Sequence, residues 1–423
     1  MQEDPLELHK RFRGKIQIAS KVPFPGHPYL AWYYTPGVAE ACREVCRRPD
    51  AVYETTNKGN VVAIVTDGTR ILGLGDIGPE AGLPVMEGKA LLFKLFAGVD
   101  ALPICLDTKD NDEIARTVRC LAPCIGGVCL EDVETPRCFA LFDKLQAQAD
   151  YPMWHDDRQG TALVVLAALY GALEVVGKRI EDVSIVMLGS GSAGGGIVEL
   201  LLDAGVSPDQ LIVCRSKGIL CRDLNEGDNE VHQALARCTN PQKRTGELRD
   251  ALDGAEVLIA ASRPGGWLGA EVLRGMASDP IVFSLSNPDP EILPETAAEA
   301  GAAVYATGRS DMPNQANNVL GFPGVFRGAL DARATGINRE MVLAAAEAIA
   351  GLARERGLTA DYIIPPVTDT EVSPRVAAAV AQAASETGIA RVPVTPEEVA
   401  DKTRSMVAEH QKIVDLLNSQ YES

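Results

Sequence analysis

The sequence predicts an α/β protein with at least two domains, one of them built on a doubly wound, mostly parallel sheet. Its second half holds five short apolar segments separated by stretches long enough for helices, an alternation typical of such a sheet. The chain has 423 residues, more than one ordinary core requires. Hydrophobic residues make up 46% of it and charged residues 23%, so each domain can bury a core.

The first half of the chain has short apolar runs that end at turn residues, as strands leading into loops do. We expect four strands there, with a helix around Ala90–Phe96 between two of them. The strands are VVAIVTDG (61–68), ILGLGD (71–76), ALPICLDT (101–108) and IGGVCLED (125–132). A segment rich in Gln, Ala and Asp near Leu141–Trp154 then precedes a new pattern, so we assign residues 1–150 to an N-terminal α/β domain.

The second domain is assigned to residues 151–385, where strand-like segments alternate with possible helices. Its predicted strands are VSIVMLG (183–189), LIVCRS (211–216), EVLIAAS (256–262), PIVFSLSN (280–287) and AAVYATG (302–308). From Asn338 to Ser423 the chain is rich in Ala and charged residues at helical spacing. This pattern predicts C-terminal helices, and we expect the segment 386–423 to pack back on the body.

Charge and composition exclude several classes of partner. The formal charge of −18 repels polyanions, and no basic stripe is interleaved with aromatics, which argues against nucleic acid. The first residues lack the apolar run of a signal peptide, and the longest apolar stretch, Thr161–Gly177, is too short to cross a bilayer. The ten cysteines have no CxxC spacing, which is typical of reduced thiols. We therefore expect a cytoplasmic protein without a membrane or nucleic-acid partner.

A glycine-rich turn follows directly on the strand-like segment VSIVMLG and precedes the apolar run IVELLL. In such a turn glycine lets the backbone approach a pyrophosphate, and the helix that follows offers free N–H groups to phosphate. The pattern alone also fits a flexible loop, but the strand, turn, helix and next strand all stand in order. We therefore predict a Rossmann-like domain that binds a dinucleotide at this turn. The residues of the turn that we assign to the dinucleotide are Gly189, Gly191, Ser192, Ala193 and Gly194.

The end of the next strand bears on the choice between NAD and NADP. NAD sites carry an acidic residue about 20 positions after the turn, where it binds the ribose 2′-hydroxyl. This chain has Arg215 and Ser216 there, followed by Lys217. Arginine and serine suit a 2′-phosphate, which favours NADP. The alternative is that these residues only face solvent, which leaves NAD open.

Two pairs of acidic residues stand where strands run into loops. Glu131 and Asp132 follow an apolar run. Asp156 and Asp157 follow His155, just before the apolar stretch that begins at Thr161. Oxygen ligands of this kind suit Mg²⁺ or Mn²⁺. Each pair alone is also typical of a solvated turn or a helix cap, and a lone histidine is more often packed than a ligand. Spacing by itself does not settle a metal site.

Tyr34 and Lys89 are candidates for acid–base chemistry. Tyr34 lies in WYYTPGVAE and Lys89 in LPVMEGKALLFK. Both types of side chain can act as acid or base only where burial or neighbouring charge moves their pKa towards neutrality. Taken alone, each is equally a structural residue.

Seven motifs in order give the chain a resemblance to malic enzymes of the compact bacterial and archaeal type, which are oxaloacetate-decarboxylating malate dehydrogenases. The resemblance extends from about Gly14 to beyond Leu330 and implies an N-terminal malic-type catalytic domain ahead of the dinucleotide domain. The motifs are YTPGVAE, VTDGTRILGLGDIGPEAGLPVMEGK, PICLDTKD, LEDVETPRCF, HDDRQGTA, SNPDPEI and PNQANNVLGFPGVFRGAL.

The resemblance implies a role for each candidate residue. Lys89 matches the general base that takes the proton from the C2 hydroxyl of malate, and Tyr34 matches the acid that protonates the enol. The carboxylates that match the ligands of Mg²⁺ or Mn²⁺ are Glu131, Asp132 and Asp157. Asn287 and Asn317 match cofactor-binding asparagines, while the residues assigned to substrate are Arg70, Asn318 and Asp156. The implied reaction converts malate to pyruvate and CO₂ with reduction of NADP or NAD.

The resemblance also implies a homodimer, in which the segment before Gly14 reaches the neighbouring subunit. We expect the enzyme core alone, without the acetyltransferase-like domain of some bacterial relatives. One departure is Arg158-Gln159, where family members often carry Gln-His. Malolactic-type, simple malate-oxidising and NAD-preferring activities remain alternatives. A silent nucleotide-binding or regulatory module is disfavoured, because the candidate catalytic and metal-binding residues are all intact.

Overall fold

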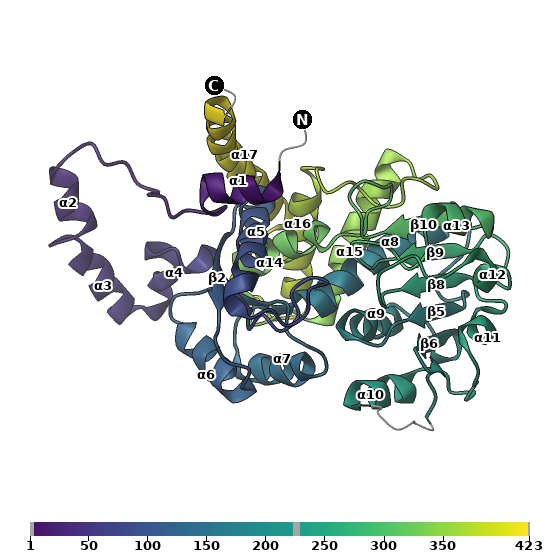
Figure 1. Cartoon of the computed structure of the whole chain (residues 1–423). Coiled ribbons are helices and arrows are strands. Elements are labelled where there is room, and N and C mark those ends of the chain that lie inside the picture. Colours follow the sequence, from purple (N-terminus) through teal and green to yellow (C-terminus); the bar gives the residue numbers. More distant parts are fainter. Residues whose placement is uncertain (1–3, 223–228, 422–423) are drawn as a thin grey trace.

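A computed structural model describes residues 4–222 and 229–421, which form two α/β domains and a set of C-terminal helices (Figure 1). The first domain contains a four-stranded parallel sheet in the order β2-β1-β3-β4. The strands are β1 (Val61–Thr66), β2 (Asp100–Cys105), β3 (Gly127–Leu130) and β4 (Met153–His155).

Helices cover both faces of this sheet. Alternate side chains of β1 point to opposite faces, as the two-residue period of a strand requires. Val62 and Ile64 face α5 (Pro79–Ala97), while Ala63 and Val65 share a core with α6 and α7. The latter helices are α6 (Asn111–Leu121) and α7 (Arg137–Gln148). Both faces are therefore apolar, and the polar chemistry is confined to the ends of the strands.

The second domain confirms the predicted doubly wound sheet, because its six strands run in the order β10-β9-β8-β5-β6-β7 with only β7 antiparallel. The strands are β5 (Ile185–Leu188), β6 (Leu211–Arg215), β7 (Gly218–Ile219), β8 (Val257–Ala260), β9 (Ile281–Ser284) and β10 (Val304–Thr307). One face packs against α8 (Thr161–Val175) and α9 (Ser192–Asp203). The other face packs against α11 (Leu248–Leu252), α12 (Ala270–Leu273) and α13 (Pro294–Glu299), while α10 (Glu230–Cys238) lies beside α9.

The C-terminal helices return the chain to the first domain. They are α14 (Phe322–Asp331), α15 (Arg339–Arg356), α16 (Val372–Glu386) and α17 (Pro396–Tyr421). Helix α16 packs against the other three, and α14 and α17 also pack against α5. The buried Arg327 of α14 donates to Asp331 and to Asn60 of the first domain, which anchors the return. No helix in the described part of the chain combines the length and apolarity that a membrane span needs.

One local prediction was wrong, and one predicted helix is present but longer than expected. ILGLGD (71–76) is not a strand but a turn, closed by the Ile71 N–H, which donates to the Gly75 carbonyl over 3.0 Å. Leu72 and Gly75 have positive φ there, which interrupts extended structure. The helix expected at 90–96 begins much earlier, at Pro79. In addition, β4 begins at Met153, so the first sheet extends just past the boundary that we placed at residue 150.

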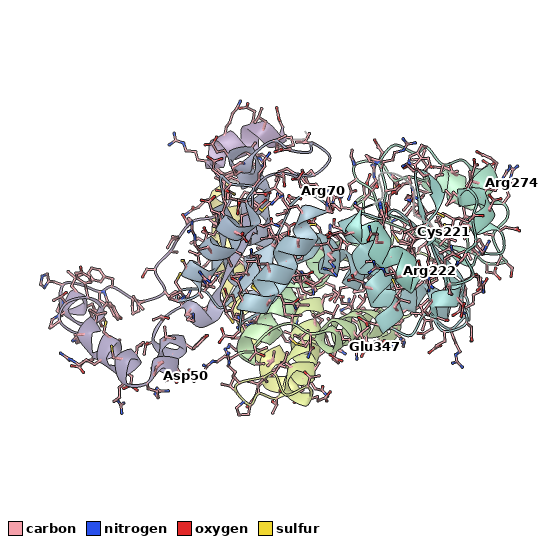
Figure 2. All side chains as sticks on the ribbon, turned by 90° about the horizontal axis from the view of Figure 1, so that it is seen from below. Asp50, Arg70, Cys221, Arg222, Arg274 and Glu347 are labelled. Carbon is pink, nitrogen blue, oxygen red and sulfur yellow. The ribbon has the colours of Figure 1, made fainter. Side chains whose placement is uncertain are left out.

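An N-terminal arm, residues 16–47, projects from the first domain (Figure 1). It follows α1 (Pro5–Phe12) and contains α2 (Pro28–Tyr33) and α3 (Val38–Arg47); none of the three helices has a buried residue. Its exposed apolar side chains include Ile18, Val22, Phe24, Leu30, Trp32, Tyr33, Tyr34 and Val38. Helix α4 (Val52–Thr55) then leads into the first sheet. Seen from below, the arm again stands clear of the body (Figure 2).

Candidate functional site

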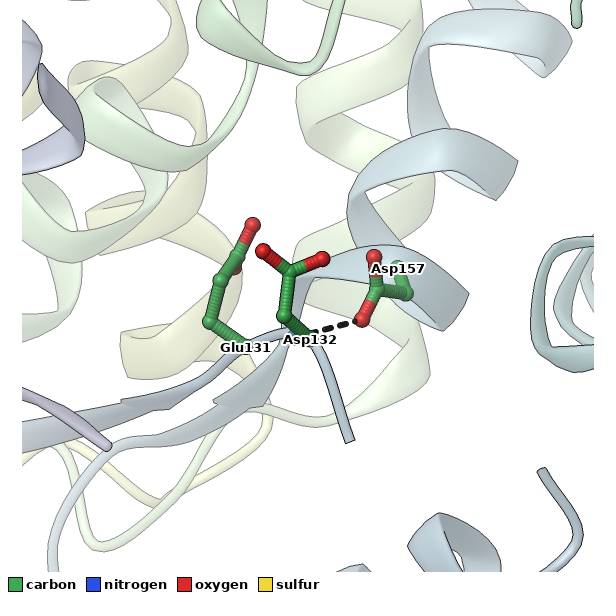
Figure 3. Close-up of side chains that lie close together, drawn as sticks. All are labelled: Glu131, Asp132 and Asp157. Atoms are coloured by element: carbon green, nitrogen blue, oxygen red, sulfur yellow. Dashed lines mark hydrogen bonds between the residues drawn. The ribbon is translucent and has the colours of Figure 1, made fainter. Parts of the chain in front are cut away.

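Acidic residues gather at the carboxyl ends of β3 and β4. Glu131 and Asp132 follow β3, and Asp157 lies in η3 (Asp156–Gly160), a π-helical turn that follows β4. The strands are parallel neighbours, so their carboxyl ends meet at one edge of the sheet. One ligand oxygen from each of the three carboxylates lies within 4.8 Å of the others (Figure 3). The Asp132 N–H also donates to Asp157 Oδ2 over 3.0 Å, which holds the two loops together.

Burial and mutual repulsion act on the carboxylates of this group, although Lys89 pairs with Glu131. Burial, and next the charge of Asp157, raise the pKa of Asp132 to about 7. The pKa of Glu131 is raised well above its ordinary value by burial and by neighbouring aspartates, although Lys89 opposes the shift. Asp132 Oδ2 is buried and accepts no hydrogen bond. Mg²⁺ and Mn²⁺ bind several carboxylate oxygens that lie close together. A buried carboxylate oxygen without a hydrogen-bond donor is available as such a ligand. The residues present therefore fit Mg²⁺ or Mn²⁺.

Lys89 lies on the buried side of α5 and reaches the same carboxylates. Its Nζ is 2.8 Å from Glu131 Oε1, 2.5 Å from Asp156 Oδ2 and 4.5 Å from the ring centroid of Phe322. Burial lowers the pKa of Lys89, but Asp156 and Glu131 outweigh it, so the pKa lies well above its ordinary value. An ammonium is therefore held between two carboxylates and over an aromatic face.

Asp156 is fully buried and joins Lys89 to two other elements. Its Oδ1 accepts from Trp154 Nε1 over 2.8 Å, and its Oδ2 accepts from Asn318 Nδ2 over 3.0 Å. A Cβ on Gly160 would lie 2.2 Å from Asp156 Oδ1, so this side chain fits only beside glycine. The structure thus brings Asn318 and Asp156 to Lys89, as expected for one site. Trp154 and Phe322 were not among the predicted site residues. Trp154 directly precedes the motif HDDRQGTA and Phe322 lies within PNQANNVLGFPGVFRGAL, and these positions were the available signal.

His155 belongs to the core of the first domain. It is fully buried, lies edge-on to Phe142 at 5.8 Å between ring centroids, and has no hydrogen bond to either ring nitrogen. Burial lowers its pKa to about 4, so the ring is neutral near pH 7. It packs rather than joining the carboxylate group.

The glycine turn lies between β5 and α9, as predicted. Gly189 has φ of 125°, which favours glycine, and a Cβ there would lie 2.2 Å from the Ala261 carbonyl. A Cβ on Gly194 would lie 2.2 Å from the Gly189 carbonyl, whereas nothing lies within 4 Å of one on Gly191. Helix α9 begins at Ser192, so its free N–H groups point away from the sheet edge into the turn. A pyrophosphate can therefore approach at Gly191.

Arg70 joins the two domains (Figure 2). Its Nη1 donates to Ser192 Oγ over 2.5 Å at the start of α9, and its backbone N–H donates to the Asp132 carbonyl over 3.0 Å. One residue thus contacts both the loop of the carboxylate group and the helix of the dinucleotide turn. The two candidate sites face each other across this contact.

The other candidate cofactor residues lie at the same edge of the second sheet. Arg215 ends β6 and is half-buried, and Ser216 follows it in an exposed turn. Asn287 follows β9 and is exposed. Its side chain lies against Gly308, because a Cβ added to that glycine would be 2.8 Å from Asn287 Nδ2. Asn317 caps the short helix η5 (Asn318–Leu320) by accepting from the Val319 N–H over 3.0 Å. Its side-chain oxygen therefore has a structural partner.

Tyr34 is not brought to this group. It follows α2 on the N-terminal arm, 70% exposed, while Lys89 is buried in the body. The arm projects away from α5 (Figure 1). Within one chain, Tyr34 and Lys89 therefore do not form one site.

Two family models match the chain over both domains. The N-terminal domain of malic enzymes matches residues 13–117, and the NAD-binding domain of malic enzymes matches residues 158–385. The chain is 51% identical over 406 residues to the bifunctional malic/malolactic enzyme of Bacillus subtilis, covering 96% of this chain and 98% of that one. It is also 51% identical over 378 residues to the NAD-dependent malic enzyme of Geobacillus stearothermophilus, covering 89% and 78%.

A solved structure agrees with these sequence matches. The crystal structure of the malic enzyme from Pyrococcus horikoshii superposes with a TM-score of 0.94 at 44% identity, covering 98% of each chain. The similarity thus includes both domains, the C-terminal helices and the site between them. The chain belongs to the malic enzyme family.

Proposed function

We propose that this protein oxidises (S)-malate and decarboxylates it to pyruvate and CO₂, with reduction of NADP or NAD and with Mg²⁺ or Mn²⁺. The observation that carries the proposal is the position of Lys89 Nζ, which lies within hydrogen-bond distance of Glu131 and Asp156 beside the carboxylate group. Arg70 brings this cluster next to the dinucleotide turn. An acid–base group, a metal-binding set and a hydride-acceptor site therefore meet.

The metal would be held by Glu131, Asp132 and Asp157. When bound, it would chelate the hydroxyl and carboxylate of malate and stabilise the negative charge that develops on the substrate oxygen. The buried, unpaired Asp132 Oδ2 and the mutual repulsion of the carboxylates support this assignment. Arg70, whose backbone contacts the Asp132 loop, would be suited to the second carboxylate of malate.

Lys89 would exchange the proton of the C2 hydroxyl. As an ammonium, Lys89 can only give up a proton; to take the proton of the hydroxyl it must first become a neutral amine. The Asp156 carboxylate lies 2.5 Å from Nζ and holds the amine in position. Trp154 and Asn318 fix Asp156 in place, so Lys89 is a catalytic residue and Asp156 is its positioning partner.

The dinucleotide would place its pyrophosphate at the turn formed by Gly189, Gly191, Ser192, Ala193 and Gly194. Arg215 and Ser216 favour NADP, because a guanidinium and a hydroxyl suit a 2′-phosphate. The name of the Geobacillus relative supports the alternative, NAD. Asn287 and Asn317 are assigned to the ribose and nicotinamide half.

Tyr34 would act in the site of a second copy of this chain, so the active protein would be a homodimer. The arm that carries Tyr34 exposes a row of apolar side chains and buries none of its helical residues against its own body. Apart from Trp267 and Leu293, the large exposed hydrophobic residues of the described chain lie in the first domain, the arm, α1 and α17. Such a surface is typical of an obligate interface. Light scattering should then give twice the chain mass of 45.0 kDa.

The proposed reaction is tested by steady-state assays of malate with NADP or NAD, with and without Mn²⁺. We expect pyruvate, CO₂ and reduced dinucleotide in equal amounts, with NADP giving the higher kcat/KM. Activity should disappear in excess chelator and return when Mn²⁺ is added. Turnover that persists in chelator contradicts the metal assignment, and a clear preference for NAD contradicts the assignment of Arg215 and Ser216.

A malolactic activity is a second candidate, because the relative from Bacillus subtilis is named a bifunctional malic/malolactic enzyme. That reaction leaves lactate and no net reduced dinucleotide. Measuring lactate beside pyruvate in the same assays separates the two activities. Lactate formed without accumulated NADPH or NADH favours the second candidate.

A further inference from the structure

Glu291 is a fully buried carboxylate that the proposed chemistry does not use. It lies in the loop between β9 and α13, at the edge of the second sheet where the parallel strands have their carboxyl ends. Its two oxygens accept hydrogen bonds from the backbone N–H and hydroxyl groups of three serines, namely Ser262, Ser284 and Ser286. Ser262 follows β8, whereas Ser284 ends β9 and Ser286 follows it.

The contacts join two neighbouring loops. Oε1 accepts from the Ser262 N–H over 2.6 Å and from Ser286 Oγ over 2.7 Å. Oε2 accepts from the Ser286 N–H over 3.2 Å and from Ser284 Oγ over 2.9 Å. The strands β8 and β9 are adjacent and parallel (Figure 1), so one carboxylate ties both of their carboxyl ends. The loop backbones depend on Glu291 for these N–H partners.

These loops border the proposed dinucleotide site. Ligands of doubly wound sheets bind outside the carboxyl ends of the strands. Ala261, next to Ser262, lies against the glycine turn, because a Cβ on Gly189 would be 2.2 Å from its carbonyl oxygen. Asn287, next to Ser286, is one of the proposed cofactor residues. One loop therefore packs against the glycine turn and the other carries a proposed cofactor residue, in each case directly beside a serine that Glu291 holds.

We propose that Glu291 is a positioning residue for the dinucleotide, which fixes the loops after β8 and β9 in the geometry that binds it. This inference rests on the proposed function only for the identity of the ligand. The geometry makes a glutamine substitution informative. Each carboxylate oxygen faces a backbone N–H, so a glutamine amide in either orientation points its own NH₂ group at one of the two N–H donors.

The test is the Glu291→Gln variant of the full chain, with NADPH and NADH titrated by fluorescence in the absence of malate and metal. We expect affinity for the better-bound dinucleotide to fall by about tenfold or more, because a buried donor is left unsatisfied. In steady state the KM for the dinucleotide should rise, with the KM for malate unchanged. Equal rises in both KM values, or an unchanged dinucleotide affinity, overturn the proposal.

Glu256→Gln is the matched control. Glu256 accepts from the Ser184 N–H over 2.9 Å and pairs with Lys178, at the opposite edge of the same sheet. A glutamine there can still turn its oxygen towards Ser184, so we expect dinucleotide affinity within about twofold of wild type. If Glu291→Gln does not fold, Ser286→Ala decides, with a loss of about threefold expected and no loss overturning the proposal. Wild-type protein that binds neither dinucleotide would instead refute the proposed function.

Discussion

At the residue scale, the proposed mechanism predicts a specific effect of removing the Lys89 amine. Lys89→Ala should lower kcat by about 10²- to 10⁴-fold, the usual contribution of a general acid–base group. Lys94→Ala is the control, because Lys94 lies on the same helix and pairs with Asp100 away from the carboxylate group. Its kcat should stay within about twofold of wild type. If Lys89→Ala retains wild-type turnover, the mechanism is wrong.

Cofactor preference is a second property decided by single residues. Arg215→Ala should lower kcat/KM with NADP by about ten- to a hundredfold and leave kcat/KM with NAD within about threefold, because only NADP carries a 2′-phosphate. Arg274→Ala, which removes an exposed arginine paired with Glu299 on the same domain, should change neither value. Equal losses of kcat/KM with both dinucleotides would show that Arg215 does not bind the 2′-phosphate.

At the residue scale, the spacing of the acidic residues left a metal site open, and only the family resemblance implied that Glu131, Asp132 and Asp157 act together. The parallel pairing of β3 with β4 places oxygens of these three carboxylates within 4.8 Å of one another, while their role as metal ligands stays a prediction. The positions of Trp154 and Phe322 at the motifs offered a signal, but their contacts with Asp156 and Lys89 could not be predicted, because buried aromatic residues look alike in a sequence. Their roles follow from contacts between distant segments, which only packing determines.

At the element scale, two glycines of the turn between β5 and α9 are predicted to have different roles, one in stability and one in dinucleotide binding. Gly194→Ala should destabilise the fold by about 2 kcal/mol, because the added Cβ would meet the Gly189 carbonyl at 2.2 Å. Gly191→Ala meets nothing within 4 Å and should leave the thermal midpoint unchanged, yet weaken dinucleotide binding where the pyrophosphate approaches. Thermal melts and NADPH titrations measure the two effects. Similar destabilisation in both variants would contradict the geometry.

The wrongly predicted strand and the longer helix also belong to the element scale. ILGLGD has the apolar alternation of a strand, but its two glycines permit the tight turn that Ile71 and Gly75 close. The helix α5 begins at Pro79, because proline is tolerated at the first turn of a helix. A short apolar run that ends at turn residues predicted a strand at 71–76, whereas the positive φ of Leu72 and Gly75 gives a turn.

At the scale of the whole molecule, the sequence predicted two α/β domains correctly and gave no sign of where Tyr34 would lie. Periodicity reports which face of an element is apolar, but it does not say which chain covers that face. The arm shows the limit of this reasoning, since its side chains are apolar and yet 70% of Tyr34 is exposed. The proposed homodimer removes the contradiction, because a second body would cover the arm.

A complementation experiment tests whether Tyr34 acts in the partner's site. Chains carrying Tyr34→Phe and chains carrying Lys89→Ala should each be nearly inactive alone. When the two are co-expressed and associate at random, half of the dimers are mixed. In each mixed dimer one site combines an intact Lys89 with an intact Tyr34 from the other chain, so we expect about a quarter of wild-type activity. Phenylalanine keeps the aromatic ring, so docking of the arm is preserved.

The control for complementation pairs Lys89→Ala with Asp157→Asn. Both residues lie in one cluster of one chain, since Lys89 contacts Glu131 and Glu131 shares a group with Asp157. In a mixed dimer of these variants each site keeps one defect, so no activity should return. Recovery with the Tyr34 pair alone therefore assigns Tyr34 to the partner's site. Failure of the Tyr34 pair to recover, in mixed dimers verified by differently tagged chains, would place Tyr34 and Lys89 in the same chain's site and require the arm to fold back onto its own body.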